Sequence, residues 1–323
     1  MDLKNFKVVA NQKIRDCAFA KLNAEVNFVN WQDKKGRMPK EQLYAELETA
    51  DAFFSSGNVK IDEELLSHCP RVKVIAQASV GYDNIDLAAC SSHNIPVTNT
   101  PGVLVDAVAD HTMALILECA RNIAGADLHV KSGTWGQRKP FRMGVDLAGK
   151  TLGIVGFGDI GSEVALRAQA SKMNVIYHNR HQRSDDAERK VRYVSFDELL
   201  KESDFIAICV TLNPSTRGLF NQEAFAKMKQ GARLVNISRG PVIDSEALYD
   251  ALASGKLAWA AADVFDPEPI PGDHKILTLP NITLTPHMAS STKETRDAMA
   301  MLTVDNILAA LKGENLLTEV KTR

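Results

Sequence analysis

The stretch TLGIVGFGDIG, residues 151–161, decides the fold. The apolar run TLGIV leads directly into Gly156, Gly158 and Gly161, and a segment of helical period follows to about Lys172. Glycines at this spacing let the chain turn sharply, and they bring backbone N–H groups and a helix N-terminus onto a pyrophosphate. The stretch therefore predicts the first strand, turn and helix of a dinucleotide-binding domain.

Further apolar runs follow this motif and alternate with segments of helical period. A parallel sheet covered by helices has this pattern, and six strands complete a dinucleotide-binding sheet. Ser195 to Glu198 has the pattern of a capping box, and Gly255 stands where a helix ending at Ser254 needs a left-handed residue. The other predicted strands are NVIYH, FIAICV, RLVNI, AWAAADV and ITLT.

The first hundred residues show the same alternation, and they predict a smaller doubly wound α/β unit. At 323 residues the chain is long enough for two domains, since domains usually hold about 100 to 200 residues. From about Ser291 to Leu311 we expect an amphipathic helix that Gly313 ends, with apolar positions at 298, 301, 302, 308 and 311. The first-half strand candidates are Lys7–Ala10, Glu25–Val29, Asp51–Phe54 and Lys73–Gln77.

Composition excludes several classes of protein. Hydrophobic residues make up 45% and charged residues 24% of the chain, which is typical of a globular protein and not of a disordered one. A net charge of -2 argues against nucleic acid as a partner. The start MDLKNFKVVA has no apolar signal core, and charges interrupt the apolar stretch 103–120, so no membrane segment is expected. Five widely separated cysteines suggest reduced, buried thiols and a cytoplasmic protein.

The end of the second strand of the motif domain bears on cofactor choice. An NAD-binding domain usually has an acid here that accepts hydrogen bonds from the ribose hydroxyls. This sequence has Asn179 and Arg180 instead, and no acid before Asp185. Arg180 and Arg183 can bind a 2′-phosphate through charge-assisted hydrogen bonds. The segment predicts NADP as the preferred cofactor, with NAD as a second one.

Polar residues follow three later strands, where a doubly wound fold binds its ligands. They are Arg239 in NISRGPVID, Asp263 and Glu268 in AADVFDPEP, and His287 in TPHMASST. Reduction of a ketone needs an acid to protonate the oxygen, and histidine titrates in the useful range. Glu268 can orient His287 and favour its protonated form, while Arg239 can bind a substrate carboxylate. We therefore predict Arg239, Glu268 and His287 as catalytic residues.

These strings, together with SVGYDNID upstream, resemble the D-isomer-specific 2-hydroxyacid dehydrogenase family over nearly the whole chain. Within it, HNRHQR and PEPIPGDHKILTLPN are most similar to the glyoxylate/hydroxypyruvate reductases and their 2-ketogluconate reductase relatives. The resemblance implies a Rossmann-type doubly wound sheet, residues 101–287, inserted into a flavodoxin-like substrate domain, residues 1–100 and 288–323. It implies a homodimer joined through the cofactor domains, with the helix at about 105–121 in the interface.

The resemblance also assigns individual residues. It gives His287 as acid/base, Glu268 as its partner and Arg239 as the carboxylate binder. Backbone N–H groups of Val80 and Gly81 would hold the substrate carboxylate as well. The cofactor would contact Gly156, Gly158, Asp159, Ile160, Gly161, Asn179, Arg180, Arg183, Ile237, Ser238, Arg239, Asp263, His287 and Ser290, with Asp159 and Ile160 at the pyrophosphate and Asp263 at the nicotinamide amide. No metal is expected.

Two positions depart from the family pattern. Val105 stands where many relatives carry a threonine near the cofactor, and Arg138 where hydroxypyruvate reductases tend to place an aromatic residue.

The predicted reaction is reduction of a small 2-keto acid, namely glyoxylate, hydroxypyruvate or 2-ketogluconate, to the D-2-hydroxy acid. Another 2-hydroxyacid dehydrogenase, such as phosphoglycerate dehydrogenase, is one alternative. A cofactor-sensing corepressor without enzymatic activity is another, because fold alone does not determine function.

Overall fold

The chain forms two compact α/β units. The computed structural model describes residues 2–31, 36–57, 59–137 and 143–321. One unit consists of residues 1–104 and 291–323, and the other of residues 105–290. The second unit is therefore inserted in the chain of the first, and the chain passes between them after Leu104 and after Ser290.

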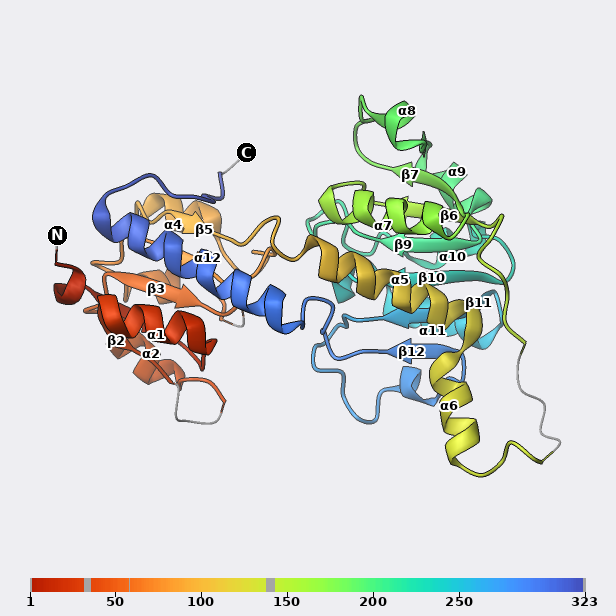
Figure 1. The fold of residues 1–323 in the computed structure, drawn as a ribbon, viewed down its shortest axis with the longest axis horizontal. Coiled ribbons are helices and arrows are strands. Elements are labelled where there is room, and N and C mark those ends of the chain that lie inside the picture. The colour runs from red at the N-terminus through yellow and green to blue at the C-terminus, as the bar shows by residue number, and fades with distance from the viewer. Residues whose placement is uncertain (1, 32–35, 58, 138–142, 322–323) are drawn as a thin grey trace. The chain divides into compact units, whose positions relative to one another are not determined.

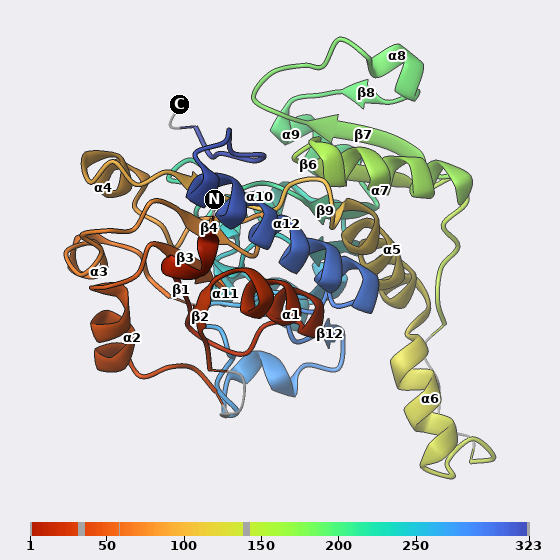
Figure 2. The same ribbon diagram turned by 60° about the vertical axis from the view of Figure 1, so that its left-hand side comes forward.

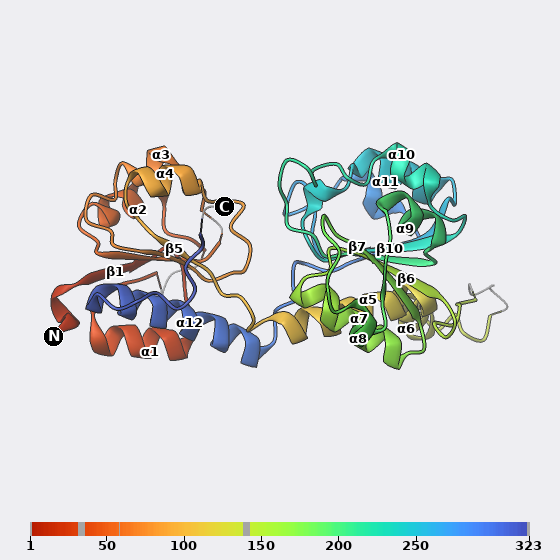
Figure 3. The same ribbon diagram turned by 90° about the horizontal axis from the view of Figure 1, so that it is seen from above.

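The first unit is built on a five-stranded parallel sheet in the order β2-β1-β3-β4-β5, the flavodoxin-like arrangement. Helices α1 and α12 cover one face, and α2, α3 and α4 lie on the other (Figure 3). The short strand β5 was not predicted from the sequence. The elements are η1 Leu3–Asn5, β1 Lys7–Ala10, α1 Asp16–Glu25, β2 Asn27–Val29, α2 Lys40–Leu47, β3 Ala52–Ser55, α3 Glu63–Leu66, β4 Ile75–Gln77, α4 Leu87–Ser92, β5 Val97–Thr98 and α12 Lys293–Lys312.

Helix α12 returns the chain to the first unit, where it packs beside α1 (Figure 1). Gly313 ends it at φ 75°, as predicted. The predicted apolar face is wrong in its first half, because Met299, Ala300 and Val304 are buried there instead of positions 298, 301 and 302. The helix also buries Asn306, whose amide oxygen accepts the N–H groups of residues 317 and 318. Buried polar side chains of this kind do not follow an apolar repeat.

The second unit is built on a seven-stranded parallel sheet in the order β12-β11-β10-β9-β6-β7-β8. This is the doubly wound order, so the predicted fold class is confirmed. The six predicted strands are present, and the two-residue edge strand β8 was missed. The elements are α5 Val105–Arg121, α6 Ile123–Lys131, β6 Thr151–Val155, α7 Asp159–Ala170, β7 Asn174–His178, α8 Asp186–Arg189, β8 Arg192–Tyr193, α9 Phe196–Glu202, β9 Phe205–Ile208, α10 Gln222–Lys227, β10 Ala232–Asn236, η2 Gly240–Val242, α11 Ser245–Ala253, β11 Leu257–Ala262, η3 Lys275–Thr278 and β12 Ile282–Leu284.

Helices cover both faces of this sheet as well. Helices α9, α10 and α11 lie on one face, and α5 and α7 pack together on the other (Figure 3). Ser195 caps α9 by accepting the Glu198 N–H at 3.2 Å, and Gly255 has φ 74°, so both predicted helix ends are confirmed. Within the described residues, no helix has the length and apolar character needed to span a membrane.

Helix α6 was not expected from the sequence. It follows α5 through Asn122 and extends away from the sheet of its unit (Figures 1 and 2). None of its residues is buried. Buried Glu118 fixes the junction, because its carboxylate accepts the N–H groups of Ile123 and Ala124 at 2.8 and 3.1 Å. The cysteines are all free thiols, and three of them are buried as predicted. The prediction is wrong for Cys17, which is exposed, and Cys209 is only partly buried.

Candidate active site

The glycine loop after β6 has backbone exposed to a ligand. A Cβ on Gly156 would lie 2.6 Å from the Cys209 carbonyl oxygen, and one on Gly161 would lie 2.3 Å from the Gly156 oxygen. Gly158 has no neighbour within 4 Å of such a Cβ, and as the N-cap of α7 it offers no capping side chain. The first N–H groups of α7 are thus left to an external acceptor, which fits a pyrophosphate.

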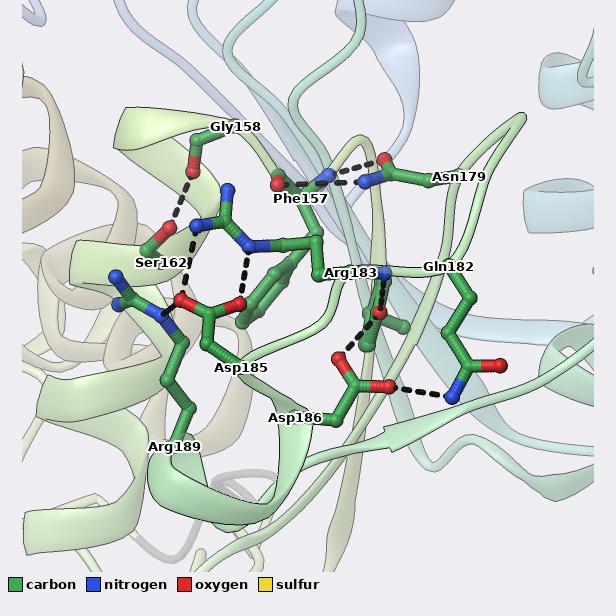
Figure 4. A network of polar contacts seen from close by, with 10 residues as sticks. Phe157, Gly158, Ser162, Asn179, Gln182, Arg183, Asp185, Asp186 and Arg189 are labelled. Atoms are coloured by element: carbon green, nitrogen blue, oxygen red, sulfur yellow. Dashed lines mark hydrogen bonds and ion pairs between the residues drawn. The ribbon is translucent and has the colours of Figure 1, made fainter.

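Asn179, predicted to bind the cofactor, supports the glycine loop from the end of β7. Its side-chain oxygen accepts the Phe157 N–H at 2.6 Å, and its amide nitrogen donates to the Phe157 oxygen at 3.3 Å (Figure 4). The neighbouring Arg180 is exposed. Arg183 forms an ion pair with Asp185. The structure therefore brings all three predicted residues to one loop and gives two of them partners within the protein.

The loop after β10 presents Arg239 and is held by a buried amide. Asn236, only 1% exposed, accepts the Ser238 N–H at 3.0 Å and donates to the Arg239 oxygen at 3.0 Å. Gly240 follows, and a Cβ there would lie 1.9 Å from the Phe265 carbonyl oxygen. Only glycine allows this loop to pack against the loop after β11.

Glu268 and His287 face each other from the loops after β11 and β12. The Glu268 Oε1 and the His287 Nδ1 are 2.5 Å apart, and Glu268 also accepts the Phe265 N–H at 3.3 Å. Burial raises the pKa of Glu268, but the hydrogen bond and charge of His287, the Phe265 N–H and the charge of Arg239 bring it below its ordinary value. The three predicted catalytic residues are thus electrostatically linked, and Glu268 is ionised at neutral pH.

Asp263 fixes the loop that carries His287. Its buried carboxylate accepts the Met288 N–H at 2.9 Å, the Ala289 N–H at 2.8 Å and the Thr285 hydroxyl at 2.6 Å. His111 of α5 lies 3.4 Å from the same carboxylate. Burial raises the pKa of Asp263, but these donors outweigh it and bring the pKa below its ordinary value. The residue predicted to meet the nicotinamide amide therefore also positions the His287 backbone.

The chain that carries these loops is similar to known proteins in sequence and in fold. Residues 113–289 match the model of the D-isomer specific 2-hydroxyacid dehydrogenase, NAD binding domain. The glyoxylate reductase of Thermococcus litoralis is 44% identical over 291 residues, covering 88% of this chain and 87% of its own. That of Pyrococcus furiosus is 38% identical over 314 residues, covering 95% and 93%.

The chain belongs to the D-isomer specific 2-hydroxyacid dehydrogenase family. Solved structures agree with this assignment. An NADPH-dependent glyoxylate/hydroxypyruvate reductase from Sinorhizobium meliloti, in complex with NADP and malonate, superimposes with a TM-score of 0.87 at 29% identity, covering 98% of this chain and 96% of that one. The protein is therefore an oxidoreductase with a nicotinamide dinucleotide-binding domain.

Val80 and Gly81 of this dehydrogenase lie in the first unit. Asn99 donates to the Val80 carbonyl at 2.9 Å, and Ser79 donates to the Gly81 carbonyl at 2.6 Å. The N–H groups of Val80 and Gly81 themselves make no hydrogen bond with any described residue. This loop can therefore offer two N–H groups to an anion.

The other predicted residues of the dehydrogenase have varied surroundings. Val105 begins α5, whereas Arg138 lies outside the described residues. In the described ranges no three His, Cys, Asp or Glu side chains form a group that could hold a metal ion. Among the predicted cofactor-binding residues, Asp159 is exposed, Ile160 and Ser290 are partly buried, and Ile237 and Ser238 are buried.

Sequence reasoning missed Asn236, Gly240 and His111 as parts of this site. Gly240 directly follows Arg239, and Asn236 lies two residues before Ser238. For Asn236, a polar residue at the end of an apolar strand was a usable signal. Gly240 has no positive φ, so only its contact with Phe265 shows why glycine is needed. His111 is 174 residues from Thr285, to which it lies at 3.2 Å, and no local pattern could reveal that contact.

The contact at Gly240 gives a test of the loop packing. Gly240→Ala would force the loops after β10 and β11 apart, and we expect a loss of about 1 to 3 kcal/mol in unfolding free energy together with a large loss of reductase activity. Gly272→Ala is the matched control, because a Cβ there meets nothing within 4 Å. Urea unfolding and steady-state rates would measure both. Equal effects of the two substitutions would contradict the packing argument.

Proposed function

We propose that this dehydrogenase reduces a small 2-keto acid to the D-2-hydroxy acid, with glyoxylate as the first candidate and hydroxypyruvate and 2-ketogluconate as others. NADPH is the preferred cofactor and NADH a second one. The observation that supports this most is the 2.5 Å contact of His287 with Glu268, within the electrostatic reach of Arg239. The glyoxylate reductases among its relatives support the substrate class.

The proton comes from His287 in this proposal. Its Nδ1 faces Glu268, so Nε2 is the ring nitrogen that can reach a substrate oxygen. The reduced nicotinamide, when bound, supplies the hydride to the keto carbon. His287 then neutralises the charge that develops on the keto oxygen by giving up its Nε2 proton. Glu268 keeps the imidazole oriented and favours its protonated form through the opposite charge.

Arg239 binds the substrate carboxylate. A guanidinium forms two parallel hydrogen bonds with a carboxylate, which fixes the keto group beside it. The Ser238 carbonyl accepts a hydrogen bond from the Arg239 Nη1 at 2.8 Å and so orients the side chain. The N–H groups of Val80 and Gly81 are a second proposed contact for the substrate. Hydrogen bonds to both carbonyls fix the loop that carries these N–H groups.

The proposed preference for NADPH rests on the loop after β7. Arg180 is exposed there, and Asn179 supports the glycine loop where an acid would otherwise accept ribose hydroxyls. The glycine loop and the first turn of α7 would hold the pyrophosphate. A steady-state assay with both cofactors over a panel of 2-keto acids, 3-phosphohydroxypyruvate included, tests this proposal. Turnover of any keto acid would also argue against a corepressor.

His287→Gln tests the proton donor. We expect its reductase rate to fall by about a hundred- to ten-thousand-fold, as for loss of a positioned general acid. NADPH binding, followed by nicotinamide fluorescence, should change little because the glycine loop and the loop after β7 hold that molecule. A variant that keeps most of its rate would show that His287 is not the donor.

Glu268→Gln tests the partner of His287. The pKa of Glu268 is below its ordinary value, so its charge is present at neutral pH and favours protonated His287. Without that charge the imidazolium of His287 has no opposite charge beside it, and the basic limb of the kcat/KM profile for reduction should move to lower pH. Asp266→Asn, an exposed acid of the same loop, is the control and should leave the limb in place.

A homodimer is the proposed assembly. Large exposed apolar side chains gather on and near α6, and such patches usually mark an interface. They are Leu117, Ile123, Leu128, Val130, Trp135 and Met143, with exposed fractions of 41, 57, 68, 52, 75 and 90%. A second copy is the natural occupant in the proposal, since none of the described residues of α6 is buried within its own unit.

Leu128→Asp with Trp135→Asp tests this interface. Two charges in an apolar contact should shift the protein from dimer to monomer in light scattering after size-exclusion chromatography. The control is Leu317→Asp, which places a charge on a side chain that is 59% exposed in the other unit. A dimer that withstands the double change would place the interface elsewhere.

A further inference from the structure

Asp185 holds two arginines at the end of the cofactor loop. Its carboxylate accepts hydrogen bonds from Arg183 Nε at 2.7 Å and Nη2 at 2.9 Å, and from Arg189 Nε at 2.6 Å (Figure 4). These hydrogen bonds hold the pKa of Asp185 well below its ordinary value, so it is charged at neutral pH. One edge of the Arg183 guanidinium, a donor predicted for a 2′-phosphate, is therefore already occupied.

The backbone of this loop is fixed before any ligand binds. The Tyr177 hydroxyl donates to Asp186 at 2.5 Å and accepts the Arg183 N–H at 2.9 Å. Gln182 donates to the second oxygen of Asp186 at 2.8 Å. The Tyr177 ring stacks on Phe157 of the glycine loop, with centroids 4.3 Å apart. Arg183 is thus anchored beside the glycine loop, and only its side chain can change partner.

A 2′-phosphate and Asp185 compete for the same donors. Both are oxygen anions that a guanidinium binds with two hydrogen bonds, so Arg183 cannot serve both through one edge. The charge of Asp185 also repels a phosphate placed next to Arg183. Arg189 lowers the cost of an exchange, because it still neutralises Asp185 when Arg183 turns away.

We propose that Asp185 is a specificity-determining residue that limits the preference for NADPH over NADH by competing with the 2′-phosphate for Arg183. The inference rests on the proposed use of NADPH. Loss of the Asp185 charge frees Arg183 and selectively strengthens binding of a nucleotide with a 2′-phosphate. A nucleotide with a free 2′-hydroxyl lacks the competing group, so its affinity depends much less on Asp185.

Adenine fragments test this without turnover. Titration calorimetry of the full chain with 2′,5′-ADP and with 5′-AMP measures the 2′-phosphate contribution directly. Asp185→Asn should bind 2′,5′-ADP about three- to tenfold more tightly, the range for removing a partly exposed competing charge. Its affinity for 5′-AMP should stay within about twofold, since that fragment has a 2′-hydroxyl in place of the 2′-phosphate that competes with Asp185. The ratio of kcat/KM for NADPH over NADH should rise in parallel.

Two further variants distinguish competition for Arg183 from the general effect of removing one negative charge. Glu188→Gln is the matched control, an exposed acid of the same short helix with the same change in charge, and it should have little effect. In an Arg183→Ala background, Asp185→Asn should no longer strengthen 2′,5′-ADP binding. Asp185 makes no side-chain cap of α8, so its loss does not uncap that helix. Asp185→Ser is the second variant should the first fail to fold.

These measurements distinguish failure of the inference about Asp185 from failure of the proposed function. The inference is overturned if Asp185→Asn leaves 2′,5′-ADP binding unchanged, if Glu188→Gln strengthens it equally, or if the gain persists without Arg183. Failure of the proposed function looks different, because it appears in the unaltered protein as absence of keto acid reduction or as preference for NADH. The fragment measurements compare variant with parent and are independent of turnover.

Discussion

The hydrogen bonds accepted by Asp263 fix the geometry on which the proposed chemistry depends. A carboxylate that is fully buried is costly unless donors surround it, and here Thr285, two backbone N–H groups and His111 do so. These hydrogen bonds help to hold His287 in a strained backbone conformation. Its φ of 50° is uncommon for a residue other than glycine. Such a conformation costs about 1 to 3 kcal/mol and persists only where its surroundings impose it.

The strand order explains why three distant segments form one site. Strands β10, β11 and β12 are neighbours in the sheet and run parallel, so their carboxyl ends share one edge. Gly240 allows the first loop to touch Phe265 of the second, and the Phe265 N–H in turn donates to Glu268. Each loop therefore depends on its neighbour. The position of Glu268 against His287 is a consequence of backbone contacts as much as of the two side chains.

The sequence predicted the fold around this site well where a signal was local. The strand TLGIV and the NVIYH strand have the predicted bounds, because glycine or polar residues stand where the apolar residues of each strand end. Strand β8 was missed because two residues at a sheet edge, Arg192 and Tyr193, carry no periodic pattern. The predicted face of α12 was wrong at positions 298, 301 and 302 because Met299, Ala300 and Val304 are buried instead. Thr303 and Asn306 are buried as well, and hydrogen bonds stabilise them there.

Partners far apart in the chain were beyond local reasoning. Asn179 was predicted as a cofactor ligand from its place after β7, yet its side chain contacts Phe157, 22 residues earlier. The pattern pointed to this loop but could not show what its polar groups already bind within the protein. The same limit applies to Asp263, whose partners come from the loop after β12 and from α5. Prediction by motif therefore named residues that the structure brings together, but it did not show their contacts within the protein.

Charge placement shows how an acidic chain can bind an anionic cofactor. A net charge of -2 gives no long-range attraction for phosphates, so the attraction must be local. Backbone N–H groups at α7 supply part of it without adding net charge. The arginines after β7 supply more, but Asp185 neutralises much of Arg183 and Arg189. A loop with both arginines unpaired would attract many polyanions. In our proposal, pairing them with one exchangeable acid keeps their hydrogen bonds for a ligand whose shape brings a phosphate directly to Arg183.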